Sequence, residues 1–189
     1  KLIVLFLVIS SLIFPWWSLS EEKKNSIVQT KSNLYVLPAE MITITSFDSY
    51  SSGEIASLDE DFISAVDFIP YLIFGGAIFL LINIFLEYKS YKKSSHLFLL
   101  LSSIFLVSCT SLFYVAMSMF SESLVGGLFG SSVLNIQSFG TSNYLEVPCC
   151  WGTDLGFYLV LLGSIIVTTL FLYKLVFYLK KKFKIIHLK

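Results

Sequence analysis

Residues 69–88 form an apolar run that constrains this chain more than any other feature. The run is interrupted by only two strongly polar residues, Asn83 and Glu87, and lysines follow it at positions 89, 92 and 93. Twenty residues in a helix span about 30 Å, which matches the hydrocarbon thickness of a bilayer. Short cytoplasmic loops collect Lys and Arg. The run therefore predicts a transmembrane helix whose lysine-rich end lies on the cytoplasmic side.

Composition places the whole chain in the same class. Hydrophobic residues make up 56% of its 189 positions, which is more than a soluble domain of this size is expected to hide. The net charge is zero, yet the charges are segregated. Ten lysines and Glu87 fall at one set of helix ends and give +9, whereas twelve acids and three lysines give −9 on the other side. This split predicts a multi-pass plasma-membrane protein with cytoplasmic termini and acidic outer loops.

The expected fold is a membrane all-α, four-helix transmembrane bundle with a small extracytoplasmic cap that contains short β-strands. The run 1–19 also fits a secretory signal, but we expect it to be retained as a helix. The expected segments are helix 1 at 1–19, the cap at 20–67, helix 2 at 68–88, a cytoplasmic turn at 89–95, helix 3 at 96–119, a second outer loop at 120–153, helix 4 at 154–179 and a basic tail at 180–189.

Each expected span carries one stripe of small or polar residues at helical spacing. Such stripes are typical of close helix packing in lipid. The predicted packing residues are Gly76, Asn83, Glu87, Ser103, Thr110, Tyr114, Gly152, Gly156 and Gly163. The alternative is that Asn83 and Glu87 line an ion or proton path, since ionisable groups in a membrane often mark function. Glu87 lies beside Lys89 at the helix end, where it can stay hydrated, so we favour packing.

The run Cys149-Cys150-Trp151-Gly152 is the most unusual local sequence. Its two cysteines fit a strained vicinal disulfide, a bond to a partner, or two free thiols. A thiol-redox role for Cys149 and Cys150 is the minor alternative, because such catalysts use Cys-x-x-Cys with a second pair. We predict no catalytic, cofactor or metal site. The expected interface anchors are Trp16, Trp17 and Trp151.

The predicted order of spans and outer segments resembles the claudin-like tetraspan membrane proteins. Trp16 and Trp17 lie near the position at which that family begins its outer sheet. The first outer loop of that family carries a Trp, then Gly-Leu-Trp and two cysteines. This chain has no Gly-Leu-Trp, and its adjacent cysteines lie in the second outer segment. The resemblance implies the topology and, as one possible role, surface adhesion.

We expect a non-catalytic accessory or structural subunit of a larger membrane or cell-envelope complex. Its expected partners are membrane lipid and other membrane protein subunits, and the sequence leaves open whether it has a small-molecule ligand. Nucleic-acid binding is not expected, because topology already explains the basic residues and the chain has no arginine. The alternatives are a claudin-like surface contact protein and a small channel or transporter component.

Overall fold

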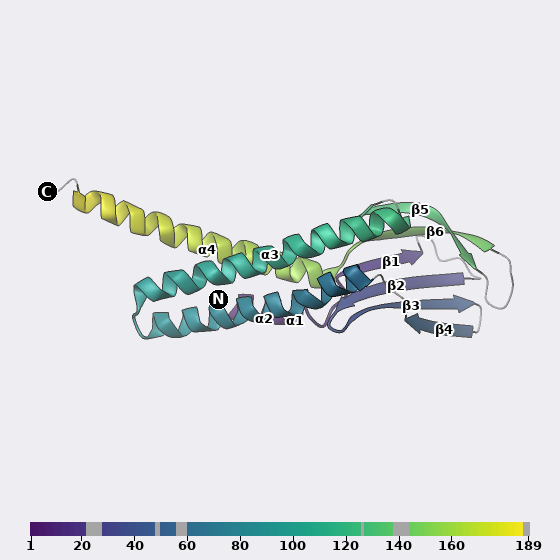
Figure 1. Ribbon diagram of the computed structural model, residues 1–189, viewed down its shortest axis with the longest axis horizontal. Coiled ribbons are helices and arrows are strands. Elements are labelled where there is room, and N and C mark those ends of the chain that lie inside the picture. The colour runs from purple at the N-terminus through teal and green to yellow at the C-terminus, as the bar shows by residue number, and fades with distance from the viewer. Residues whose placement is uncertain (22–27, 48–49, 56–59, 126, 138–143, 187–189) are drawn as a thin grey trace.

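The computed structural model places four helices at one end of an elongated molecule and a β-sheet at the other (Figure 1). It describes residues 1–21, 28–47, 50–55, 60–125, 127–137 and 144–186. The helices are α1 (Leu2–Ser10), α2 (Glu60–Tyr88), α3 (Lys92–Val125) and α4 (Leu155–Ile186). The strands are β1 (Trp17–Glu21), β2 (Val28–Val36), β3 (Ala39–Phe47), β4 (Tyr50–Ile55), β5 (Gly130–Gln137) and β6 (Tyr144–Thr153).

Three of these helices are long and apolar enough to cross a membrane: α2, the 94–120 part of α3, and the 155–180 part of α4. The predicted four-helix transmembrane bundle is therefore wrong. As described, α1 has nine residues, whereas about 20 are needed to cross the hydrocarbon. Pro15 follows soon after α1, and the chain then enters β1 at Trp17. The apolar run 1–19 thus contains a helix and the start of a buried strand.

The predicted small cap is a six-stranded antiparallel sheet with the order β4-β3-β2-β1-β6-β5. Strand β1 begins within the segment expected as helix 1, β2 to β4 come from the first outer segment, and β5 and β6 come from the second. Strand β1 joins the two groups, because it pairs with β2 on one side and with β6 on the other. The region 120–153 is therefore not a loop. It contains the last turns of α3 followed by a hairpin.

One face of the sheet carries the buried side chains. Met41, Leu34 and Trp17 lie opposite one another across β3, β2 and β1, and all three are buried. Farther along β2 and β3 this face becomes polar, and the Ser32 Oγ lies 2.9 Å from the Thr43 Oγ1, whereas Leu19 and Trp151 keep it apolar along β1 and β6. The apolar part lies nearest the helices, so a single buried core runs from the helices into the sheet.

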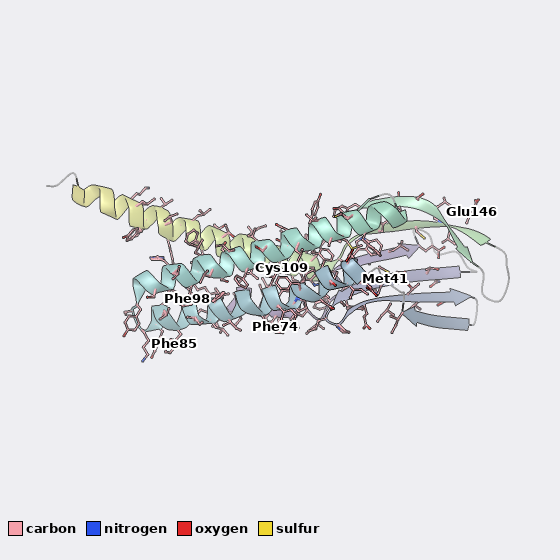
Figure 2. The ribbon with its side chains drawn as sticks, in the orientation of Figure 1. Met41, Phe74, Phe85, Phe98, Cys109 and Glu146 are labelled. Carbon is pink, nitrogen blue, oxygen red and sulfur yellow. The ribbon has the colours of Figure 1, made fainter. Side chains whose placement is uncertain are left out.

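The end of the helices remote from the sheet holds the tight turn between α2 and α3. Ser90 has a positive φ of 64° there. The Tyr91 amide donates to the Leu86 carbonyl, and the Ser90 amide donates to the Glu87 carbonyl. These are the two bonds of a Schellman helix ending. Figure 2 shows Phe85 and Phe98 near this turn, Cys109 midway along α3, and Glu146 on the sheet.

Helix α4 begins beside α1 and the sheet and then diverges from α2 and α3 toward its C-terminal end (Figure 1). It continues as a helix through much of the predicted basic tail, to Ile186. Residues 187–189 of that tail lie outside the described residues.

Candidate functional site

A polar cluster joins helices at the end opposite the sheet. Glu87 on α2 forms ion pairs with Lys1 and with Lys174 on α4. The Lys1 ammonium also donates to Asn83 Oδ1 at 2.6 Å. The Asn83 amide in turn donates to the Ser95 carbonyl at 2.5 Å and to the Ser95 hydroxyl at 2.9 Å on α3. Lys1, which precedes α1, is thus tied through this cluster to α2, α3 and α4.

The cluster contains Asn83 and Glu87, the two residues for which an ion path was the alternative interpretation. Asn83 has no exposed surface, and both ends of its amide are occupied by protein groups. A buried amide with all its bonds made to protein stabilises packing and offers nothing to a passing ion. The geometry gives no support to a hydrated path along this face of α2.

Small residues bring the helices close at two places. A Cβ on Gly76 would lie 2.8 Å from Leu106 Cδ2, so any larger residue here would require the buried Leu106 side chain to shift. The Ser102 hydroxyl donates to the Gly76 carbonyl at 2.8 Å across the same contact. A Cβ on Gly163 would lie 2.7 Å from Val8 Cγ2, where α4 meets α1.

The other predicted packing residues play different parts. The Ser103 hydroxyl lies 2.7 Å from the Thr168 hydroxyl and links α3 to α4. The Thr110 hydroxyl is buried but donates to carbonyls of its own helix. Tyr114 is 54% exposed and lies on the outside of α3. Gly152 lies in β6 rather than in a helix, and a Cβ there would meet the ring of Phe129 at 2.9 Å.

The three tryptophans expected at the membrane interface lie in the core. Trp16 and Trp17 are at most 2% exposed, and Trp151 is also buried. Each indole N–H donates to a backbone carbonyl, at distances of 2.8 to 3.2 Å: Trp16 to Ser11, Trp17 to Leu128, and Trp151 to Gly127. A buried indole needs such a partner. These residues therefore hold the helix–sheet junction together and are not available to a lipid headgroup.

Gly156 completes that junction. Its amide donates to the Pro15 carbonyl at 2.9 Å, and the Asp154 amide donates to the Trp16 carbonyl at 2.9 Å. The Trp16 ring packs edge-on against Phe113 of α3 and Phe157 of α4, with centroid distances of 5.0 and 6.1 Å. The segment between α1 and β1 is thus fixed to the first turn of α4.

The adjacent cysteines lie on opposite faces of β6. Cys149 is buried on the core face, and Cys150 points to the other face, where its sulfur lies 3.6 Å from the Ser20 hydroxyl. Successive side chains in a strand alternate, whereas a disulfide needs Cβ atoms about 3.8 Å apart. A vicinal disulfide does not fit this strand. Burial, with smaller effects from Glu21 and Cys150, raises the pKa of the Cys149 thiol, so at neutral pH it is a poor nucleophile.

Sequence reasoning missed several residues of these contacts: Lys1, Ser95, Ser102, Thr168 and Lys174. In the sequence the lysines indicate only topology, and the hydroxyls lie within long apolar helices where no local pattern marks their partners. Within the described ranges, no three His, Cys, Asp or Glu side chains gather as they would around a metal ion.

No protein-family model matches this chain, and no curated protein is similar enough to count as a relative.

Proposed function

We propose that this chain is a non-catalytic structural subunit of a larger membrane assembly, in which the helices fix the sheet at the membrane surface. One observation carries the proposal: helices and sheet share a single buried core, and the most distinctive side chains are used to build it. The tryptophans and Gly156 attach the sheet to the helices, whereas the polar cluster, Gly76 and Gly163 hold the helices to one another. A sheet held rigidly in this way suits a protein whose sheet is a contact surface for other subunits.

The orientation follows from the position of the charges. The turn after α2 and the distal part of α4, which carry most of the lysines, lie at the end of the molecule remote from the acidic sheet (Figure 1). The positive-inside rule then places this end in the cytoplasm and the sheet outside. The C-terminal part of α4 lies on the cytoplasmic side in this arrangement, and the plasma membrane is the proposed location.

The edges of the sheet are the natural surfaces for a protein partner. Strands β4 and β5 are the outermost strands, and an edge strand offers backbone donors and acceptors to another chain. Val133 on β5 is 56% exposed, and Ile55 on β4 is 72% exposed. A neighbouring subunit in the same membrane can cover either edge.

A second candidate is a surface contact protein, as the claudin-like resemblance implies. The observation that favours it is that the sheet extends along the long axis of the molecule, beyond the ends of the helices (Figure 1). Aggregation of vesicles that carry the protein with its sheet outward would favour this role. Strictly lateral association with one complex would count against it.

The test is extraction in a mild detergent, followed by measurement of the mass and stoichiometry of what remains bound. We expect one or more membrane proteins in fixed ratio with the chain. Val133→Lys on β5 and Ile55→Lys on β4 form a matched pair, and we expect one of them to release the partner while the other retains it. A free monomer, or partners that neither substitution affects, would contradict the proposal.

A further inference from the structure

A cavity of about 250 Å³ lies between α3 and α4 near the end of the helices remote from the sheet. Its walls are His96 of α3 and four residues of α4: Phe171, Lys174, Leu175 and Tyr178. The His96 and Tyr178 rings have centroids 6.4 Å apart. Helix α4 diverges from α3 toward this end of the molecule (Figure 1).

The charges beside this cavity are unbalanced. Lys1 and Lys174 share the single carboxylate of Glu87, so the three groups carry a net charge of +1. The side chains of Lys1 and Lys174 are only 17% and 23% exposed, so water screens this charge poorly. A lysine ammonium has three donors, and Lys174 can bind Glu87 and a further acceptor together. An anion in the cavity would balance the charge.

The remaining walls indicate what kind of anion fits. The His96 ring and the Tyr178 hydroxyl bring further polar groups to the cavity, and either can donate to a phosphate oxygen. Phe171 and Leu175 supply apolar surface, which a free inorganic ion does not use but an acyl chain does. Basic pockets between helices on the cytoplasmic side are typical sites for anionic lipid headgroups.

We propose that this cavity binds the phosphate headgroup of one anionic phospholipid of the inner leaflet, with the phosphate on Lys174 and His96 and an acyl chain along Phe171 and Leu175. The proposal rests on the proposed placement of the helices across a membrane. It gives the lysine-rich end of the helices a specific lipid-binding role. The positive-inside rule accounts for these lysines only as a signal of membrane orientation.

The experiment uses the full chain in nanodiscs of phosphatidylcholine with a minor fraction of phosphatidylglycerol. Native mass spectrometry after release counts the lipids that stay bound. We expect one phosphatidylglycerol per chain, retained roughly tenfold in preference to phosphatidylcholine. Both lipids carry a phosphate, but only phosphatidylglycerol has a net negative charge that balances the charge beside the cavity. Lys174→Gln should remove this preference, and His96→Gln should weaken it without disturbing Glu87.

Lys180→Gln is the matched control, because it removes an exposed lysine of the same helix that does not line the cavity. It should retain the preference. Thermal unfolding of each variant shows that it is folded. Absence of a preference, equal losses in Lys174→Gln and Lys180→Gln, unchanged binding in both cavity variants, or displacement by inorganic phosphate would each overturn the proposal. Retention of protein partners is measured separately, so failure here is distinct from failure of the structural role.

Discussion

Gly156→Ala tests the helix–sheet junction with a single methyl group. A Cβ at this position would lie 2.6 Å from the Phe14 carbonyl oxygen and 2.8 Å from Trp16 Nε1. The first atom is backbone, and the second belongs to an indole whose N–H is already bound to the Ser11 carbonyl. Neither can move without breaking the attachment of β1 to α4.

The magnitude follows from two opposing terms. An alanine in a helix is up to about 1 kcal/mol better than a glycine, while an extra methyl in a packed site costs about 1–3 kcal/mol. At Gly156 the steric term should dominate, because the obstacle includes backbone. We expect the free energy of unfolding to fall by about 1–2 kcal/mol. The assay is titration with SDS in mixed micelles, with near-ultraviolet circular dichroism of the buried tryptophans as the signal.

Gly75→Ala is the matched control in another apolar helix. A Cβ there would meet only ring atoms of Phe105, the nearest at 2.6 Å, and that half-buried ring can tilt away. We expect less than half of the loss seen at Gly156. If Gly156→Ala is as stable as the original chain, or if Gly75→Ala is the more damaging of the two, the account of the junction is wrong.

Three further predictions concern local chemistry. Ser90→Gly should raise stability by about 0.5–1 kcal/mol and Ser90→Val should lower it, since φ is positive there; thermal unfolding in detergent measures both. Maleimide should label half-buried Cys150 before buried Cys149, and mass spectrometry measures both. Because the pKa of the Cys149 thiol is raised, the labelling rate of Cys149 should keep rising with pH. Glu87→Gln should lower the free energy of unfolding by roughly 1 kcal/mol in the same assay, a value reduced because the ion pairs are partly exposed. Glu146 is exposed, so Glu146→Gln should change the free energy of unfolding little.

The sequence predicted the three long apolar helices because each is a long apolar run with few charges. It also predicted Gly76 and Gly163 as packing residues, because small residues at helical spacing are a local signal. The geometry at both positions agrees with that interpretation. The segregation of charge predicted which ends of the helices lie together.

The sheet was harder to predict, because its decisive contacts are far apart in the chain. Strand β1 alternates apolar and polar residues, but it has only five of them and follows the apolar residues of α1 closely, so Trp17 and Leu19 were assigned to the end of that apolar run. In β6 the residues that point away from the core include Pro148, Cys150 and Gly152, so the strand lacks the usual alternation of apolar and polar residues. No local pattern marks the pairing of β1 with β6.

The polar cluster was partly predicted. Asn83 and Glu87 share a face of α2 and were expected to bind neighbouring helices. Their partners Lys1 and Lys174 are more than 80 residues away along the chain, and lysines near helix ends are ordinarily explained by topology. Only the fold brings both ammoniums to one carboxylate.

In the proposed arrangement, the sheet and the lysine-rich helix ends lie on opposite sides of a membrane. The direct measurement is labelling of intact cells with a membrane-impermeant maleimide, in a background that carries Cys150→Ser. We predict that Ser131→Cys on β5 is labelled at once, and that Ser94→Cys at the start of α3 is labelled only after permeabilisation; both positions are exposed. Labelling of Ser94→Cys in intact cells, or equal labelling of both variants, would contradict the account.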